Sequence, residues 1–468
     1  MKPPKIQLVK PGSRMDGWLT RQFSSSLFSY RDIFGMLGPL VLDQFFVYLI
    51  SMLTTSMISA SSQESVSAVS LVSPITYLVM AIFGAVSSGG AVVVAQYKGR
   101  GDEQKVRRSA GQVVCATFLV ALIACTLLVC FAGPIIDALF GAAEPIIRQK
   151  ARDYLVGFSL SMIPFSLYSS VFAVFRGIGA TKTCLRLTII INLIHLFASM
   201  LFLNVLKLDI VGTALSYLIA RIIGGGVALY LLMGSHSIIR VPIREIARFD
   251  FAILKSIFKL GVPFAVEQVF FNGGNLLAQT YLVRLGTVSV AANAIGTSAF
   301  GLLYAAGLSV GTLSLTVIGQ CIGAGDTELA RRYGKRMIFL GIGVIVLSIA
   351  ILYPLMPLIL RLYAPEPETL VVINRIILVA LIPMPFFWAT SNVTPNMLNA
   401  AGDANFTSLI SLMTMWVVRI AGGYVAAITL GFGVEGIWFM MGFEWVVRSV
   451  IYLLRFHGKR WLLKKTIE

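Results

Sequence analysis

The chain has 468 residues, of which 57% are hydrophobic and only 13% are charged, and its formal net charge is +17. A soluble domain carries about 25% charged residues, so this composition excludes an ordinary soluble fold. The positive charge would suit a nucleic-acid partner, but no soluble stretch is long enough to form a basic face on a folded domain. We therefore expect no nucleic-acid partner and a lipid bilayer as the surroundings.

The chain opens with a basic arm, residues 1–32, that is too polar for the core of a signal peptide. After it come about twelve apolar runs, each close to the roughly 20 residues that span a bilayer. Backbone groups in lipid must be hydrogen-bonded within the segment, so these runs are predicted to be helices. The short alternating segments of a barrel are not present. The predicted fold is an all-α polytopic membrane protein.

Basic residues gather in every second connection between the predicted spans, and the intervening loops carry few. The clusters fall in residues 98–108, 176–186, 240–259, 331–336 and 455–465. Positive charge is retained on the cytoplasmic side of a membrane. We therefore predict an even number of spans, with both termini on the cytoplasmic side of the cell inner membrane.

Residues that would support metal binding or catalysis are sparse. The five cysteines lie in or beside apolar runs without metal-ligand spacing, and the three histidines are scattered. No Ser-His, His-metal or paired-acid constellation is visible. We expect no metal site, no cofactor and no enzymatic activity, and we expect a monomer.

Two halves of the chain repeat each other. The runs Gln96–Asp102 and Gln320–Asp326 share their glutamine, both glycines and the aspartate. The displacement between these two runs also relates Asp43 to Glu267 and Gly212 to Gly436. A constant displacement across polar loops and membrane acids indicates an internal duplication. The glycine-rich runs each end an apolar helix and lack the lysine of a phosphate-binding loop, so they are predicted to be tight turns with glycine at positive φ.

The duplication predicts two pseudo-symmetric lobes of six helices each. We place the N-lobe at residues 33–233, a cytoplasmic linker at 234–255, the C-lobe at 256–455 and a cytoplasmic tail at 456–468. Both halves start from the same side of the membrane, as in parallel repeats. Such pairs commonly enclose a central cavity whose opening alternates between the two sides.

Asp43 and Glu267 are the most informative residues, since each lies near the middle of an apolar run. A carboxylate at that depth is costly, so it faces a cavity, is paired, or is protonated. A carboxyl group that titrates near neutral pH can exchange a proton for a cation, which is the basis of antiport. A purely structural role, satisfied by a neighbouring helix, is the alternative. We predict that these two acids couple ion and cargo.

Polar and aromatic residues near the two acids form the predicted substrate cavity. Asn272, Asn275 and Gln279 share one face of the seventh helix, and aromatic rings can hold flat cations. Asn192 and His195 lie in the fifth span and face either the cavity or another helix. The full predicted set is Gln44, Gln268, Asn192, His195, Asn272, Asn275, Gln279, Phe46, Phe270 and Trp388.

Other features of the spans have more ordinary interpretations. Glu444 and Arg448 lie four residues apart on one helix face, which favours a local structural pair. Arg221 and Arg419 also lie within apolar runs. Pro39 and Pro263 precede the two acids by four residues, and a bend there would couple protonation to helix movement.

These residues resemble the multidrug and toxic compound extrusion (MATE) transporters over nearly the whole chain. The resemblance rests on the acid after a proline in the first span, the seventh-span glutamate, the paired Gln-x-x-Gly-x-Gly-Asp turns, and the runs 291–295 and 317–326. It implies efflux of organic cations and drugs driven by an inward proton or sodium gradient. It also implies that Asp43 is the N-lobe acid and Glu267 the C-lobe glutamate.

Two departures from the family pattern bear on the coupling ion. Where some members carry a fifth-span aspartate this chain has Leu196, and where others carry a tenth-span aspartate it has Thr390. Sodium prefers several hard oxygen ligands, so the losses favour protons over sodium. The alternative function is a flippase for a lipid-linked precursor, which would need a basic cavity instead of the acidic, aromatic one predicted. A channel would not need an acid in each half.

Overall fold

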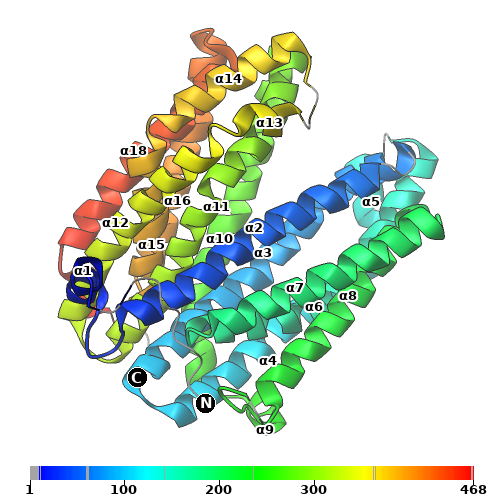
Figure 1. The fold of residues 1–468 in the computed structure, drawn as a ribbon. Helices are drawn as coiled ribbons and strands as arrows, with labels where there is room; N and C mark the ends of the chain where they lie inside the picture. The colour runs from blue at the N-terminus through cyan, green and yellow to red at the C-terminus, as the bar shows by residue number, and fades with distance from the viewer. Residues whose placement is uncertain are drawn as a thin grey trace. The chain divides into compact units, whose positions relative to one another are not determined.

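The computed structural model describes residues 10, 12–59, 63–141, 143–235, 237–361, 363, 365–464 and 467. Residues 1–9 and 11 of the predicted arm and residues 465, 466 and 468 of the predicted tail lie outside this set. No strand occurs among the described residues, which are almost entirely helical (Figure 1). The predicted all-α fold is confirmed.

The helices follow one another with short connections. Those up to the linker are α1 (Arg14–Phe23), α2 (Tyr30–Ser59), α3 (Gln63–Arg100), α4 (Glu103–Cys130), α5 (Ala132–Phe140), α6 (Pro145–Gly177), α7 (Thr181–Ser199), η1 (Met200–Val205), α8 (Asp209–Met233) and α9 (Ile243–Ala247). Those after it are α10 (Phe251–Leu282), η2 (Val283–Leu285), α11 (Thr287–Gly323), α12 (Thr327–Leu352), α13 (Met356–Arg361), α14 (Pro367–Leu381), η3 (Met384–Trp388), α15 (Ala389–Ala400), α16 (Ala404–Met413), η4 (Thr414–Ala421), α17 (Gly422–Tyr424), η5 (Val425–Thr429), α18 (Gly433–His457) and η6 (Arg460–Leu463).

The chain forms two compact units. Apart from the last two residues, one unit holds Phe46–Val269 and the other holds Met1–Phe45 with Phe270–Thr466. In the first unit, α6 packs against α3, α4 and α8, and in the second, α11 packs against α12, α14 and α15. The boundaries fall inside α2 and α10, so the first part of each of these helices packs with the opposite half of the sequence.

Ten described helices are long and apolar enough to cross a membrane, and the pair Pro367–Leu381 with Met384–Ala400, bent by 57°, is an eleventh candidate. The remaining long helix, α10, has 32 residues and would extend about 48 Å. It falls short in hydropathy because it carries Glu267 and four amides, Gln268, Asn272, Asn275 and Gln279. The sequence predicts about twelve spans, and α10 is the remaining helix of that prediction.

The two glycine-rich runs form matching turns. Gly101 and Gly325 both have φ of 77°, which an L side chain rarely adopts. The next residue in each run caps the following helix: the Asp102 carboxylate accepts from the Lys105 amide at 2.9 Å, and the Asp326 carboxylate from the Leu329 amide at 2.8 Å. The predicted turns are therefore confirmed in both halves, as is the reason for glycine.

A second pair of matching corners precedes α8 and α18. In the first half Lys207 and Asp209 both have φ of 51°, and at the equivalent positions of the second half Gly431 and Gly433 have φ of 74° and 61°. Asp209 is held by the Lys150 ammonium at 2.9 Å and the Ser65 hydroxyl at 2.6 Å. The same backbone corner is thus made with ordinary residues in one half and with glycine in the other.

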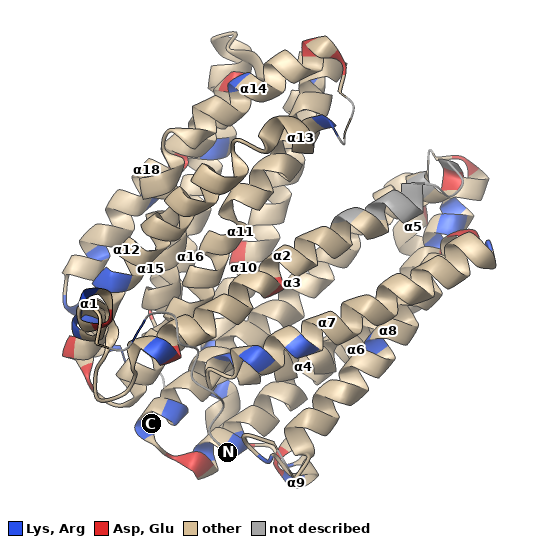
Figure 2. Ribbon diagram, in the orientation of Figure 1, with Lys and Arg blue, Asp and Glu red and all other residues tan. Residues whose placement is uncertain are grey.

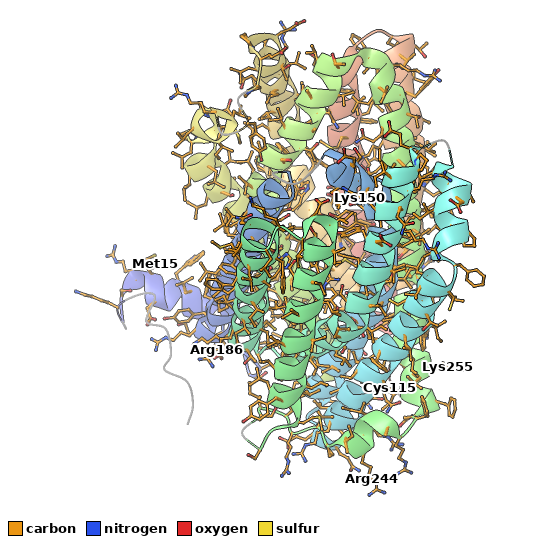
Figure 3. The ribbon with its side chains drawn as sticks, turned by 90° about the vertical axis from the view of Figure 1, so that its right-hand side faces the viewer. Met15, Cys115, Lys150, Arg186, Arg244 and Lys255 are labelled. Atoms are coloured by element: carbon orange, nitrogen blue, oxygen red, sulfur yellow. The ribbon has the colours of Figure 1, made fainter. Side chains whose placement is uncertain are left out.

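Most charged residues of the unit Phe46–Val269 lie toward the ends of its helices, with Arg221 and Glu267 as exceptions inside α8 and α10 (Figure 2). Lys150 lies toward one end and Arg244 at the opposite end (Figure 3). At the Arg244 end the linker is fastened to α4, since the Gln112 amide donates to the Glu245 carbonyl at 2.9 Å and Arg108 pairs with Asp250 at 2.6 Å.

The basic connections of the other unit are also joined to one another. The Tyr333 hydroxyl donates to the Phe23 carbonyl at 2.8 Å, and the Arg332 guanidinium to the Ser24 carbonyl at 3.1 Å. Arg455 pairs with the buried Asp403 at 2.7 Å. The Arg331 guanidinium donates to the His457 carbonyl. The segment after α1, the start of α12 and the end of α18 therefore lie at one end of this unit.

Candidate functional site

Asp43 lies on α2, one turn after Pro39, and its side chain is buried with 3% exposure. It belongs to the unit Met1–Phe45 with Phe270–Thr466. One turn earlier, the Leu40 carbonyl accepts a hydrogen bond from the Ser309 hydroxyl of α11 at 3.0 Å. The acid predicted for the N-lobe therefore packs in the unit that holds most of the C-terminal half.

Glu267 lies at the corresponding place on α10, one turn after Pro263, and it is half-buried. It belongs to the other unit, Phe46–Val269. A Cβ atom on Gly261 of the same segment would lie 3.1 Å from the Val86 Cα of α3, so the two backbones approach closely. Each acid lies just before the residue of α2 or α10 at which its helix passes to the other unit.

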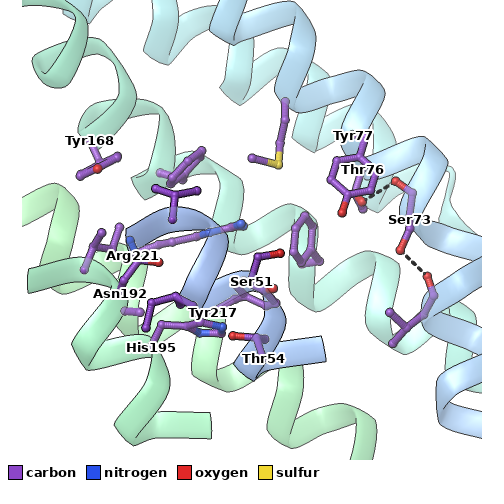
Figure 4. Close-up of a pocket in the computed structure, with 18 of the residues that line it drawn as sticks. Ser51, Thr54, Ser73, Thr76, Tyr77, Tyr168, Asn192, His195, Tyr217 and Arg221 are labelled. Atoms are coloured by element: carbon purple, nitrogen blue, oxygen red, sulfur yellow. Dashed lines mark hydrogen bonds between the residues drawn. The ribbon is translucent and has the colours of Figure 1, made fainter. Parts of the chain in front are cut away.

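The unit Phe46–Val269 contains a cavity of about 570 Å³, which we call the N pocket (Figure 4). Side chains from α2, α3, α6, α7 and α8 line it, including the predicted residues Asn192 and His195. A volume in this range accommodates a drug-sized molecule. Its walls are aromatic and hydroxylic, with Tyr77, Tyr154, Phe158, Phe165, Tyr168, Tyr217, Ser51, Thr54, Ser73 and Thr76 among the lining residues.

Arg221 of α8 is the charged group of the N pocket. Its guanidinium carbon lies over three aromatic rings, 4.4 Å from the Phe158 centroid and 4.7 Å from those of Phe165 and Tyr217. The same guanidinium donates to the Ser161 hydroxyl at 2.6 Å. Its residue exposure is only 5%. In the described part of this unit the ion pairs involve Arg107, Arg108, Arg148 and Lys150, and none involves Arg221.

The surroundings of Arg221 offset only part of the cost of burying its charge. Taking a cation out of water costs several kcal/mol even after relaxation. Cation–π contacts return about 0.5 to 2 kcal/mol each, and one hydrogen bond to a charged group about 1.5 to 3 kcal/mol. A guanidinium with five N–H donors retains capacity for an acceptor in the cavity.

His195 and Asn192 occupy one wall of the N pocket. The His195 imidazole stacks on the Tyr217 ring with centroids 4.2 Å apart and planes 21° from parallel. The Asn192 amide donates to the Thr188 carbonyl at 2.8 Å, and the Thr188 hydroxyl is hydrogen-bonded to the Tyr168 hydroxyl at 3.0 Å. Both predicted fifth-span residues therefore line a cavity, and both also contact neighbouring side chains or backbone.

The other unit contains a cavity of about 530 Å³, which we call the C pocket. It is lined by residues of α10, α11, η3, α15, η4 and α18. Asn275, Gln279 and Trp388 of the predicted set line it. The Trp388 ring stacks on Tyr304 at 4.9 Å, and the Trp438 indole N–H donates to the Asn293 side chain at 3.0 Å.

A three-membered charge cluster borders the C pocket. Glu444 is fully buried and pairs with Arg448 on its own helix and with Arg419 of η4, whose Nε lies 2.7 Å from the Glu444 Oε2. Both arginines line the cavity. The predicted Glu444–Arg448 pair is present in the structure, but the sequence did not reveal that Arg419 shares the same carboxylate. The segments α17 and η5 separate Arg419 from Glu444 along the chain, so the sequence holds no local signal for that contact.

The rest of the predicted cavity set lies outside the lining of these two pockets. These residues are Gln44, Gln268, Asn272, Phe46 and Phe270, and the predicted coupling acids Asp43 and Glu267 also lie outside the lining. Phe270 is 45% exposed and packs edge-on to Trp416 at 6.2 Å. The Thr390 hydroxyl, at the second position that departs from the family pattern, donates to the Phe386 carbonyl at 2.6 Å. Both pockets are lined by aromatic rings, and arginine is the charged residue among their described lining residues.

Comparison with known proteins matches this organisation. The MatE family profile matches the chain twice, over residues 39–201 and 263–425. The second match begins and ends the same number of residues after the first as Glu267 lies after Asp43. The predicted duplication is therefore confirmed.

The chain is 23% identical over 439 residues to the uncharacterized transporter YisQ of Bacillus subtilis, covering 92% of this chain and 95% of that one. It is also 23% identical to the probable multidrug resistance protein NorM of Thermotoga maritima, over 88% and 89% of the two chains.

Solved structures share the fold. An outward-facing MATE family transporter of the MOP superfamily superposes with a TM-score of 0.82 at 16% identity, covering 91% of this chain and 95% of that chain. A MOP superfamily transporter from Pyrococcus furiosus, described as having a binding pocket of reverse polarity, gives 0.81 at 17% identity over 93% and 97%. With the family profile matched in both repeats over most of its length, the chain belongs to the MATE family of membrane transporters.

Proposed function

We propose that this protein exports drug-like organic molecules across the cell inner membrane by alternating access, as an ion-coupled antiporter and a monomer with both termini in the cytoplasm. The observation that carries the proposal is the pair of aromatic cavities, about 570 and 530 Å³, built from corresponding helices of the two repeats. Relatives with drug-resistance names support the substrate class. The clustering of basic connections at one end of each unit supports the orientation.

Organic cations are the proposed cargo and protons the proposed coupling ion, with Asp43 and Glu267 as the coupling groups. Burial of Asp43 supports its role, because a carboxyl group at membrane depth is costly and is retained where it is functional or paired. Both acids lie close to the point where their helix changes unit. Protonation of either acid changes how the adjoining part of α2 or α10 packs within its own unit. This links proton binding to helix movement, which antiport requires.

Ethidium efflux from vesicles under separately imposed proton and sodium gradients tests this function. We expect a proton gradient alone to drive efflux, and Asp43→Asn and Glu267→Gln each to reduce the driven rate about tenfold or more. The matched controls are Asp137→Asn and Glu435→Gln, whose carboxylates are partly exposed surface partners of Arg148 and Arg375. Unchanged efflux in both acid variants would remove the assigned roles, and efflux driven by sodium alone would reassign the ion.

A second candidate function is translocation of a lipid phosphate, and the buried arginines favour it. Arg221 lines the N pocket, and Arg419 and Arg448 line the C pocket. Guanidinium groups match phosphate geometry well. Proteoliposomes carrying a fluorescent phosphatidate test it, since dithionite bleaches only the outer-leaflet dye. A bleaching time course equal to that of protein-free liposomes would exclude this candidate.

A further inference from the structure

We propose that the N pocket is a binding site for aromatic monoanions, with Arg221 holding the ligand's carboxylate or sulfonate against its planar guanidinium. This site goes beyond the proposed function, because it adds a class of ligand opposite in charge to the organic cations proposed as cargo, and it rests on that function only in assigning the ligand to transport. The site itself stands on the contacts of the described residues of Phe46–Val269.

The charge balance of the pocket is the first argument. Several cations among the described residues of this unit are paired with acids: Arg108 pairs with Asp250, Arg148 with Asp137, and Lys150 with Asp209. Arg221 has three rings and a hydroxyl instead. No Asp or Glu is among the described residues that line the cavity. An entering anion would therefore meet an uncompensated positive charge, and an entering cation would be repelled.

The repeat supplies the second argument. The position equivalent to Arg221 in the other half is Trp445, which packs parallel to Phe300 with ring centroids 6.2 Å apart. The same helix position is therefore filled by an apolar side chain in the C pocket. An arginine is not required there by the packing of the repeat, which indicates that its charge serves the cavity.

The geometry of the cavity is the third argument. Arg221 extends between the side chains that surround the pocket, near Tyr217 and His195 (Figure 4). The neighbouring rings of Phe165 and Tyr168 stack 5.5 Å apart, and His195 lies on Tyr217 at 4.2 Å. Flat rings on several walls favour a flat ligand. A guanidinium binds a carboxylate through two parallel N–H groups, so one end of that ligand should be an anion.

Binding of three naphthalene probes, which share one ring system and carry a negative, a neutral or a positive substituent, tests the site. These are 2-naphthoate, neutral 2-naphthamide and 2-naphthylmethylammonium, titrated calorimetrically into the purified full chain at neutral pH without any ion gradient. We expect the wild type to bind the anion about tenfold or more tightly than the cation. Equal affinity for the anion and the cation would overturn the proposal, and this comparison needs no variant.

Two substitutions assign the preference to Arg221. Arg221→Gln should weaken 2-naphthoate binding about tenfold or more while leaving 2-naphthamide nearly unchanged. Arg186→Gln is the matched control, since Arg186 is an exposed arginine of α7 outside the pocket lining and loses the same charge. An unchanged affinity for 2-naphthoate in Arg221→Gln would overturn the assignment. If that variant elutes as an aggregate, Arg221→Lys replaces it, with a smaller loss expected because the charge remains without the planar fork.

Competition separates an aromatic ligand from a lipid headgroup. Short-chain phosphatidate is titrated into the complex with 2-naphthoate, and weak displacement is expected. Displacement of 2-naphthoate by phosphatidate at concentrations below the dissociation constant of 2-naphthoate itself would overturn the aromatic assignment. Since these measurements involve no gradient, they can fail while ethidium efflux succeeds, and the reverse also holds.

Discussion

The N pocket and the C pocket are built by corresponding helices, yet their buried charges are arranged differently. The position of Arg221 in the N pocket corresponds to Trp445 in the C pocket. The carboxylate Glu444 corresponds to Ala220. The C pocket thus holds two arginines around one acid, whereas the N pocket holds one arginine within aromatic rings.

This difference shows which features the duplicated scaffold imposes. The turns at Gly101 and Gly325 have the same φ, and the corners before α8 and α18 adopt positive φ at equivalent positions. Pocket side chains differ at most of the compared positions. The backbone is therefore fixed by folding, while the charge inside each pocket is set separately and is the part open to functional specialisation.

The largest predicted effect follows from the shared carboxylate of the C pocket. Glu444→Gln should destabilise the protein by about 3 to 5 kcal/mol, because it leaves two buried guanidinium groups without their counter-charge. All six tryptophans lie in Met1–Phe45 or Phe270–Thr466, so tryptophan fluorescence during denaturation reports on this unit.

Glu435→Gln on the same helix is the matched control for the carboxylate prediction. Its carboxylate is 31% exposed and lies 3.9 Å from Arg375, and an exposed pair of this kind contributes about 0 to 1 kcal/mol. A loss of stability in Glu444→Gln no larger than in the control would show that the cluster is not held by its carboxylate.

An intermediate effect is expected at the backbone corners that precede α8 and α18. Gly431→Ala should destabilise by about 1 to 2 kcal/mol, because it puts a Cβ atom on a residue with positive φ. Lys207→Gly, at the equivalent corner, should stabilise by up to about 1 kcal/mol, since Lys207 already adopts that conformation and is exposed. Thermal unfolding of the two variants measures both changes, and shifts of the same sign would contradict the equivalence of the corners.

The smallest effect on stability is expected in the N pocket. Arg221→Met should change the free energy of unfolding by no more than about 1 kcal/mol, because it removes a buried charge without leaving an unpaired acid. Residues 46–269 contain no tryptophan, so unfolding is followed here by circular dichroism, which reports on the helices of the whole chain. A loss as large as that of Glu444→Gln would mean that Arg221 is needed for folding, and the contrast between the pockets would fail.

Much of the fold was predictable because it depends on local chemistry. Apolar length, alternation of basic connections and the constant displacement between the repeats indicated the spans and the duplication, and the glycine-rich run that holds Gly101 indicated a tight turn. Asn192, His195, Asn275, Gln279 and Trp388 were selected as polar or aromatic groups at depth, and they line the two pockets.

The arrangement of charge was not predictable, because it depends on packing between distant segments. Arg419 and Glu444 lie on separate helices, with α17 and η5 between them along the chain. The aromatic surroundings of Arg221 come from α6 and α8, and the whole of α7 lies between Phe158 and the arginine in the sequence. The assignment of Asp43 to the unit with Phe270–Thr466 likewise reflects how helices pack, and hydropathy along the sequence carries no information on that packing.

The polarity of α10 has a consequence for how the protein is made. Insertion machinery admits a nascent segment according to its own partition free energy, and a carboxylate together with four amides in one helix opposes release into lipid. The next helix, α11, is 37 residues long and carries no Asp, Glu, Lys or Arg. We expect α10 to leave the translocon together with α11 as a hairpin, so that the same side chains that make the helix useful also delay its entry until its neighbour has been synthesised.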